Sequence, residues 1–408
     1  MLQWIPEYYR FLGRCFVNSF KGDTRFYTWM TALSVLVLIG LNAYCRQLVD
    51  GLATTGMTDH VSWGMYIANF TYLVGIAAAA VMLVIPVYIY KNKELHDVVL
   101  FGELLAISVI VMCMLFVTAD LGRPERMWHL FPIVGRVNFP VSMLSWDVIV
   151  LTIYLILNAH VCGYLLYMRY LGRPASPALY MPFVFLSIVW AISIHTVTAF
   201  LYVGLGARPY WNSAIIAPRF IASAFVAGPA FIILALQLIR KYGGFPVKDK
   251  ALLTLRSIMQ VTMLINFFLL GCEVFTEFYT DSLHVASAKY LYFGLHGYDA
   301  LVPWIWTAIG LNTVATVLLL LPASKGLRVL DLACVLCIVG IWIEKGMGLI
   351  IPGFIPTPLG QIVEYVPSTN EILVCVGIWA FGLLFYTVLV KTALPILRGE
   401  LSAGPSGN

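Results

Sequence analysis

The amino-acid sequence predicts an all-α integral membrane protein with ten transmembrane helices. Of its 408 residues, 61% are hydrophobic and only 11% are charged, and the mean hydropathy is +0.88. A soluble domain carries about a quarter charged residues, so a soluble globule of this size is excluded. The formal net charge of +5 is too small and too dispersed to favour nucleic-acid binding. The remaining class is a multi-pass protein of the cell membrane.

Ten apolar stretches are each long enough to cross a bilayer, which takes about 20 residues. In chain order they are expected at residues 28–49, 62–90, 98–118, 141–168, 181–203, 214–240, 256–279, 302–321, 328–350 and 371–394. They define a membrane domain over 28–394, between an N-terminal segment (1–27) and a C-terminal tail (395–408). In the N-terminal segment, apolar residues at helical spacing from Trp4 to Cys15 predict a helix that lies in the membrane interface.

A weak similarity relates the beginnings of two spans that run in the same direction. Residues 67–70 read IANF and residues 221–224 read IASA, with four helices between the two positions. This would relate spans two to five with spans six to nine as a parallel repeat. The chain would then be two repeated four-helix bundles plus two extra helices, with chance similarity as the alternative.

Basic residues predict which loops face the cytoplasm, because Lys and Arg accumulate on that side. Of the 25 Lys and Arg residues, 17 fall on one set of alternate loops and 8 on the other. The richer set includes both termini, so both termini are expected in the cytoplasm. The outer loops at 119–140, 204–218, 280–301 and 351–370 are longer and rich in Pro, Trp, Tyr and His. Long ordered loops commonly carry function, so we expect the outer face to be the working face.

Ionisable residues at membrane depth are costly, so they point to function. Six such groups are expected inside the spans: Glu103, Asp147, His195, Glu273, Glu277 and Glu344. All except Glu103, which lies toward the cytoplasm, fall in the outer half of their helices. A proton relay centred on Asp147 and His195 is one interpretation, because a buried carboxyl group and an imidazole can both change charge. The alternative is ion pairing, of Glu344 with Lys345 or an arginine and of Glu277 with a loop cation.

The histidines and cysteines lack the ligand patterns of a redox centre. A b-type haem needs two axial ligands at one depth, whereas His195 lies in the outer half and His160 near the cytoplasmic end of its span. Cys334 and Cys337 lie on one apolar helix without a second pair, unlike the closely spaced ligands of iron–sulfur clusters. We therefore expect neither haem, iron–sulfur cluster nor metal in this chain.

Several motifs resemble those of a known membrane family. Residues 61–70 read VSWGMYIANF, residues 120–128 read DLGRPERMW, residues 145–147 read SWD and residues 195–200 read HTVTAF. These segments resemble the NrfD/PsrC family of polysulfide reductase membrane subunits, in the ten-span branch of the DsrP-type and HmcC-type subunits. The resemblance covers about residues 28–394.

The resemblance implies a subunit that binds a quinone, often menaquinone, near the outer face. It also implies an exported ferredoxin-like iron–sulfur partner at that face, further cytochrome and membrane subunits, and a role in dissimilatory sulfur metabolism. The residues expected at the quinone site are His60, Trp63, Tyr66, Asn69, Asp120 and Arg123.

Other interpretations of these residues stay open. The aromatic residues would also suit the interfacial belt of a membrane protein. Asp120 and Arg123 would also suit an ion pair, with each other or with neighbours, that holds the loop. A secondary transporter and a haem-bearing anchor are the alternative functions for the chain.

Overall fold

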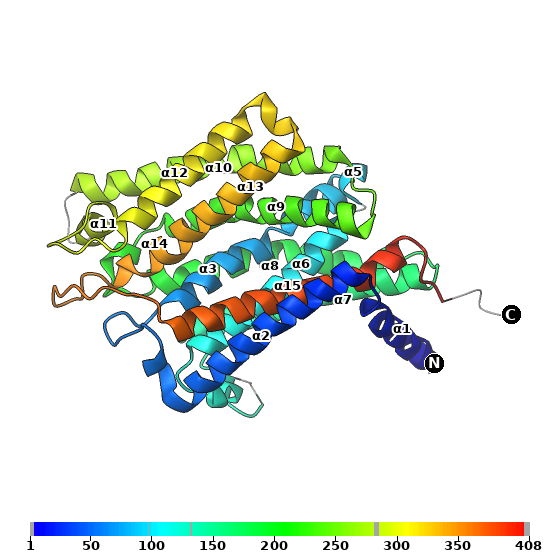
Figure 1. Cartoon of the computed structure of the whole chain (residues 1–408), viewed down its shortest axis with the longest axis horizontal. Coiled ribbons are helices and arrows are strands. Elements are labelled where there is room, and N and C mark those ends of the chain that lie inside the picture. The colour runs from blue at the N-terminus through cyan, green and yellow to red at the C-terminus, as the bar shows by residue number, and fades with distance from the viewer. Residues whose placement is uncertain (1–3, 97, 131–132, 281–284, 404–408) are drawn as a thin grey trace.

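The computed structural model describes residues 4–96, 98–130, 133–280 and 285–403, and its long helices run side by side along one axis (Figure 1). Within these residues, ten helical segments are long and apolar enough to cross a membrane. No β-strand forms in the described part of the chain, where the extended structure is a single bridge between Leu295 and Tyr298. The predicted all-α membrane fold is confirmed.

Each predicted span overlaps one of the observed spans. The spans are α2 (Thr24–Asp50), α3 (Met65–Ala78) continued by α4 (Val81–Val84) and η2 (Ile85–Ile89), α6 (Val99–Asp120), α7 (Met143–Tyr170), α8 (Pro177–Val203), α9 (Ile216–Gly243), α10 (Asp249–Thr280), α12 (Val302–Leu320), α13 (Leu327–Trp342) continued by η6 (Ile343–Met347) and α14 (Gly348–Ile350), and α15 (Thr369–Leu397). Shorter helices lie at the ends of the spans: α1 (Trp4–Ser19), η1 (Gly51–Thr54), α5 (Lys93–His96), η3 (Pro124–Leu130), η4 (Pro209–Trp211), α11 (Val285–Tyr292), η5 (Pro322–Lys325) and η7 (Pro352–Phe354).

The largest difference from the predicted edges is at α10, which begins at Asp249 rather than at residue 256. Its first two turns are too polar to stand out as an apolar stretch. Arg256 is nevertheless buried there, where its guanidinium donates to the Ser324 hydroxyl at 2.6 Å and to the Leu319 carbonyl at 2.8 Å. Contacts with the end of α12 therefore hold a turn that hydropathy does not reveal.

The spans form two groups of four and one pair. Helices α3, α6, α7 and α8 contact one another, as do α9, α10, α12 and α13, and α2 lies along α15. The two groups meet where α3 contacts α9 and η6, while α15 also contacts α6. In Figure 1, α10 and α12 lie on one side of the molecule, α2 and α15 lie on the other, and α3 lies between them. This grouping agrees with two four-helix bundles plus two extra helices.

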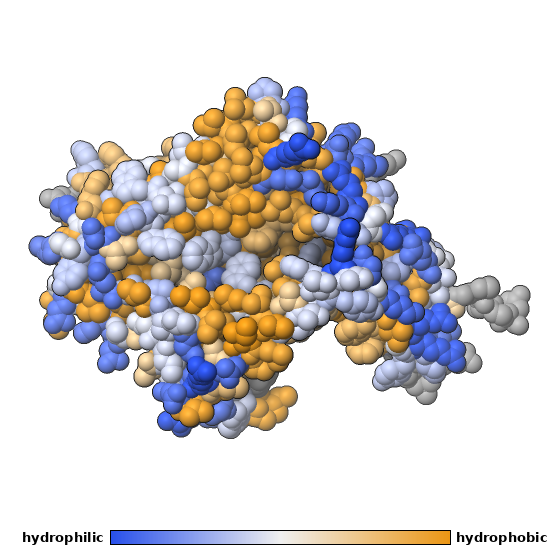
Figure 2. Space-filling view, viewed as in Figure 1, coloured by the Kyte–Doolittle hydropathy of each residue, from blue (hydrophilic) through white to orange (hydrophobic). Residues whose placement is uncertain are grey.

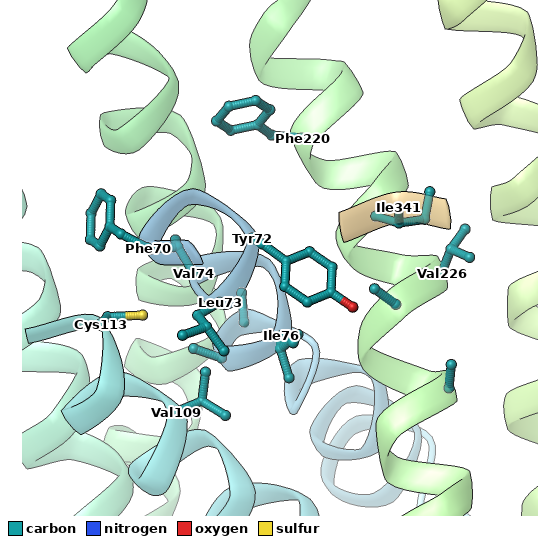
Figure 3. Close-up of a cluster of buried hydrophobic side chains, with 14 of the residues drawn as sticks. Phe70, Tyr72, Leu73, Val74, Ile76, Val109, Cys113, Phe220, Val226 and Ile341 are labelled. Atoms are coloured by element: carbon teal, nitrogen blue, oxygen red, sulfur yellow. The ribbon is translucent and has the colours of Figure 1, made fainter. Parts of the chain in front are cut away.

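Helix α3 is apolar on all sides because it is surrounded by protein on all sides. Twelve of its 14 residues are buried. In Figure 3, Phe70 extends on the side of Cys113 of α6, whereas Tyr72 extends toward Val226 of α9 and Ile341 of α13. The Tyr72 hydroxyl donates to the Ile338 carbonyl at 2.9 Å and so joins α3 to the second group. The ionisable side chains inside the spans are arranged around this central helix.

The surface of the bundle suits a lipid environment. Figure 2 shows apolar side chains over its middle and hydrophilic side chains toward its ends. Both termini lie at one end, here called the termini face (Figure 1). The opposite end, here called the long-loop face, is formed by residues 51–64, 121–130, 133–142, 204–215, 285–301 and 351–368. That the termini face lies in the cytoplasm stays a prediction.

Candidate functional site

A buried ionic cluster joins three elements of the second group near the long-loop face. Arg219, in the first turn of α9, forms ion pairs with Glu273 of α10 and with Glu344 of η6, the latter at 2.9 Å. The ammonium of Lys345 lies 3.1 Å from the same Glu344 carboxylate. All four side chains are buried. Because two cations face two carboxylates, the charges balance, as buried charges require.

Two buried amides complete the surroundings of Glu344. Asn312 of α12 donates to Glu344 Oε2 at 2.8 Å, and Asn266 of α10 lies 3.4 Å from the same oxygen. The ion pairs of Glu344 with Arg219 and Lys345 confirm the ion-pair alternative for this residue. Glu277 is buried one helical turn beyond Glu273 on α10.

Glu344 and Lys345, which are consecutive in the sequence, are both buried in a π-helical turn. Consecutive residues of an α-helix point about 100° apart, and a π-turn is a local widening that is often found at functional sites. Both side chains lie in η6, which has this geometry. Gly346 follows them against α3, where an added Cβ would lie 3.2 Å from the Ala68 carbonyl oxygen. The small residue therefore lets η6 approach the central helix closely.

A small cavity lies between the ionic cluster and the first group of helices. Lys345 lines it from η6, His195 from α8, Thr71 from α3 and Ser223 from α9. Its volume of about 10 Å³ is close to the minimum that holds one water molecule. His195 is fully enclosed, with Nδ1 3.3 Å from the Ala191 carbonyl and Nε2 without a partner among the described residues. The cavity thus borders an ammonium, an imidazole and two hydroxyls.

Hydroxyl groups connect this cavity to an aromatic cluster at the long-loop face. Thr71 forms a short hydrogen bond with the Tyr202 hydroxyl. The Tyr202 ring lies 5.7 Å from that of Trp63 and 5.5 Å from that of Trp211. Trp63 also contacts Phe354 of η7 with a centroid distance of 5.8 Å. A continuous set of contacts therefore runs from Trp63 through Tyr202, Thr71 and the cavity to the ionic cluster.

Asp147 lies beside this set of contacts without touching His195. Helices α7 and α8 lie side by side, as expected for consecutive spans. The Thr198 hydroxyl, one turn beyond His195, donates to Asp147 Oδ1 at 3.0 Å. The second oxygen, Oδ2, is buried and has no partner among the described residues. The two groups expected to form a pair are therefore connected through one turn of α8 rather than by a direct hydrogen bond.

The residues expected around a quinone have different surroundings. His60 is exposed on a loop, and Trp63 is half-buried in the aromatic cluster. Tyr66 is fully buried, and its hydroxyl donates to Gln47 Oε1 of α2 at 2.6 Å. Of these three, only Trp63 joins the contacts described above.

Asn69 holds helices together through both ends of its amide. Its Oδ1 accepts from the indole nitrogens of Trp342 at 3.0 Å and Trp379 at 2.9 Å. Its Nδ2 donates to the Met65 carbonyl at 2.8 Å. Asn69 therefore links α3 with α13 and α15, and its polar atoms are already engaged.

Asp120 and Arg123 lie at the end of α6 but do not pair with each other. Arg123 is 74% exposed and lies 3.5 Å from Glu125, which is a neighbour in the same loop. Asp120 has a buried Oδ1 that lacks a partner among the described residues. Arg123 therefore pairs with a neighbour in its loop, as the structural alternative predicts, whereas one carboxylate oxygen of Asp120 is buried.

Glu103 belongs to the other half of the membrane. It is buried near the beginning of α6, and the Cys162 thiol of α7 donates to Oε2 at 3.3 Å. Cys334 and Cys337 are buried free thiols on α13. Among the residues that the structure describes, no group of three or more His, Cys, Asp or Glu has an arrangement that could hold a metal ion.

Glu371 is a further buried carboxylate, and sequence reasoning missed it. It accepts from the backbone nitrogens of Gly56 and Met65, each at 3.0 Å, and from the Tyr365 hydroxyl. Burial raises the pKa of Tyr365, so its hydroxyl stays protonated and donates. The available signal is the sequence STNE at 368–371, a capping-box pattern of which the Ser368 half forms: its hydroxyl accepts from the Glu371 nitrogen at 3.1 Å. Glu371 thus holds two long loops at the start of α3.

Comparisons with known proteins agree with this architecture. The family "Polysulphide reductase, NrfD" matches residues 53–356. The chain is 26% identical to a putative membrane subunit of dimethyl sulfoxide reductase from Halobacterium salinarum, over 92% of each chain. It is 25% identical to a selenate reductase subunit from Mesobacillus selenatarsenatis, over 89% of this chain and 93% of that protein. It is 23% identical to the Hdr-like menaquinol oxidoreductase integral membrane subunit of Archaeoglobus fulgidus, over 92% and 95%. The chain belongs to the NrfD family of polysulphide reductase membrane proteins.

Proposed function

We propose that this chain is the quinone-interacting membrane subunit of a multi-subunit oxidoreductase. It binds menaquinone or a related quinone near the long-loop face and exchanges electrons with a ferredoxin-like iron–sulfur subunit docked there. The name of the Archaeoglobus fulgidus relative, a menaquinol oxidoreductase membrane subunit, supports the substrate class. The observation that carries the proposal is the continuous set of contacts from Trp63 to the ionic cluster.

A quinone head needs an apolar surface and hydrogen-bond partners for its two oxygens. Tyr202, Trp211 and Phe354 are buried against Trp63 at the long-loop face, and the partly exposed Trp63 presents the aromatic surface of this cluster. We place the quinone ring against Trp63, with His60 of the preceding loop as a candidate hydrogen-bond partner. Tyr66 and Asn69 support this surface from behind, because their polar atoms already bond to other helices.

Oxidation of a quinol to a quinone releases two electrons and two protons. In this proposal, the electrons pass to an iron–sulfur cluster of the partner subunit, and the protons pass inward along Tyr202 and Thr71. Each hydroxyl accepts a proton on one side as it gives one up on the other. His195 and Lys345 at the cavity, followed by Glu344, Glu273 and Glu277, continue the relay, and the protons leave to water beyond Glu277 at the end of α10. Quinone reduction would use the same groups in reverse.

Asp147 belongs to this relay as a group that takes up and gives up a proton. It bonds to Thr198 on the same helix as His195 and Tyr202, and its free oxygen is a position for exchanging a proton. Glu103 lies in the opposite half of the membrane, so its place in a relay would extend the route toward the termini face.

Exposed apolar side chains on the long-loop face support a partner subunit there. Ile133 is 97% exposed and Leu359 is 87% exposed, and Trp128 and Val141, in the same connection as Ile133, are also exposed. Apolar side chains gathered on a face beyond the membrane are typical of a protein–protein interface. Further cytochrome and membrane subunits, a DsrP-type complex and a role in dissimilatory sulfur metabolism stay predictions from the family resemblance.

A secondary transporter is the second candidate function. Two four-helix groups and an interrupted helix at η6, with charged side chains between them, are also features of transporters. A transporter would move a solute into vesicles in the absence of any electron donor.

The test is quinol-dependent reduction of the iron–sulfur partner by the purified complex, with a water-soluble menaquinol analogue as donor. Trp63→Ala should raise the KM for the quinol, because it removes the aromatic surface, while iron content per complex stays unchanged. Trp304→Ala is the matched control, since Trp304 is an exposed tryptophan of α12 in the other group. Unchanged quinol kinetics in both Trp63→Ala and His60→Ala would place the site elsewhere.

A further inference from the structure

Helix α1 lies at the termini face and presents two different sides. On one side Phe11 is buried against α7, with its ring 5.2 Å from Tyr167 and 5.0 Å from Tyr170. On another side Tyr9 and Phe16 are exposed. A short helix with aromatic residues on its free side is typical of the boundary between lipid headgroups and acyl chains. Figure 1 shows α1 beside the end of the bundle that carries both termini.

A hollow of about 620 Å³ lies between α1 and the C-terminal segment. Arg10, Arg14 and Lys21 line it from α1 and the turn that follows, and Ser402 lines the opposite wall. Arg10 and Arg14 are one helical turn apart, so both side chains lie on the same side of α1. Gly13 lies between them, and a Cβ added there would meet no atom within 4 Å. The hollow is therefore basic and has room for a ligand group.

The charge of the hollow is positive after its one acid is counted. Glu400 also lines it, and its carboxylate lies 3.5 Å from Arg398. Arg14 is held in place, because Nη1 donates to the Tyr170 hydroxyl at 3.1 Å and to the Ser402 carbonyl at 2.9 Å. An arginine has three further N–H donors on its other nitrogens, in a planar arrangement that suits phosphate oxygens.

We propose that this hollow binds the phosphate of an anionic phospholipid from the leaflet at the termini face. Three cations around one space select a negatively charged headgroup, and basic pockets at the membrane boundary bind such lipids. The exposed aromatic side of α1 then contacts the acyl chains. A lipid fits better than a soluble anion, because the hollow is continuous with apolar side chains such as Val17. The bound lipid would hold α1 and the C-terminal segment together.

The experiment measures lipid binding to the purified full-length protein in mild detergent by native mass spectrometry. Phosphatidylglycerol, phosphatidylcholine and inorganic phosphate are titrated separately. Wild type should bind phosphatidylglycerol in preference to phosphatidylcholine. The double variant R10Q/K21Q should bind phosphatidylglycerol about 30-fold more weakly, from about 1 kcal/mol for each basic residue lost. R10Q/K21Q removes two charges without touching the hydrogen bonds of Arg14.

The control K325Q/R328Q makes the same charge change on the termini face but outside the hollow, and it should bind like wild type. A third variant, Gly13→Phe, fills the hollow without changing charge and should also lose the lipid. Wild-type affinity in both R10Q/K21Q and Gly13→Phe overturns the proposal. Equal binding of phosphatidylcholine overturns the selection by charge, and equally tight binding of inorganic phosphate overturns the lipid as ligand.

Discussion

Lys345 is the residue at which the cavity and the ionic cluster meet. Its ammonium lies 3.1 Å from Glu344, and its side chain lines the cavity that His195 borders from the other side. An ammonium carries three donors, so Lys345 can hold the carboxylate and also donate into the cavity. Arg219 cannot replace it, because its guanidinium already bridges Glu273 and Glu344. Arg219 therefore bridges the two carboxylates, whereas Lys345 binds Glu344 and lines the cavity.

Asp147→Asn tests whether proton exchange at this position matters to turnover. The amide keeps an oxygen that accepts from Thr198, so the shape and the hydrogen bond of the site persist. Because the amide cannot give up or take a proton at this position, we expect quinol turnover per assembled complex to fall about 100-fold or more. The amount of assembled complex should stay near normal. Turnover and assembly are measured on one preparation.

Thr198→Val is the companion variant, because it removes the hydrogen bond and leaves the carboxyl group of Asp147 in place. It should retain most of the turnover. If Asp147→Asn turns over normally and instead lowers the amount of folded complex, Asp147 is a structural anchor and takes no part in the relay.

The sequence shows which charged residues lie inside the spans, but it does not show which residues contact them. Glu273, Glu344 and His195 stand out because charge or imidazole inside an apolar stretch is rare. Thr71, Tyr202, Asn266 and Asn312 do not, because hydroxyls and amides are common in membrane helices. Arg219 follows Pro218 at the edge of a loop and falls among the outer-loop cations in the sequence, although it is buried. Which loop-edge cation turns inward depends on the fold.

Two glycines determine how closely the first and last spans approach each other. A Cβ added at Gly377 of α15 would lie 2.6 Å from the Cα of Gly40 of α2. Small residues at such a contact let two membrane helices lie with their backbones together. The Trp29 indole nitrogen also donates to the Thr387 hydroxyl of α15 at 3.2 Å. The α2–α15 pair therefore depends on backbone proximity more than on large side chains.

Gly377→Leu should separate this pair and lower the thermal stability of the purified protein. Overpacking of a close contact costs about 1–3 kcal/mol. Gly163→Leu is the control, since Gly163 is an exposed helical glycine of α7 with no atom within 4 Å of an added Cβ. Its melting temperature should stay the same or rise slightly, because leucine favours helix over glycine. Equal melting temperatures for the two variants would contradict the close contact.

The elements themselves follow well from the sequence, because a spanning helix needs only length and apolar composition. The π-turn at η6 does not, because one widened turn leaves the composition of the span unchanged. The partners of its Glu344 lie on α9, α10 and α12, which are distant from η6 in the sequence. The surroundings of the residues expected at the quinone site do not follow from the sequence either. His60, Trp63 and Tyr66 are close in sequence, but His60 is exposed on a loop, Trp63 is half-buried and Tyr66 is buried in the first turn of α3.

For the whole molecule, the two ends of the bundle have different features. The ionic cluster, the aromatic cluster and the Glu371 anchor all lie toward the long-loop face. The termini face carries the basic hollow and most of the Lys and Arg residues. Under the proposed function, electrons and protons are exchanged at the long-loop face, and the termini face meets the charged surface of the membrane.

Reporter fusions test that direction. A topology reporter fused after Pro124 should register outside the cytoplasm, and one fused after Lys248 should register inside, because 17 of 25 basic residues lie on the side of Lys248. A fusion after Ala403 should match the one after Lys248. The reverse result would put the long-loop face, and with it the proposed partner, in the cytoplasm.

The contact between α2 and α15 also has a consequence for the order in which the protein is made. The first span is complete at Asp50, but its main partner begins only at Thr369. At a synthesis rate of about 5–20 residues per second, α2 waits about 15–60 s before α15 leaves the ribosome. During this time α2 is an inserted helix without its principal neighbour, although the eight spans between them can already associate. The closing step of folding is then the arrival of the last span, so a nascent chain that stops early leaves its first helix exposed to the machinery that removes unassembled membrane proteins.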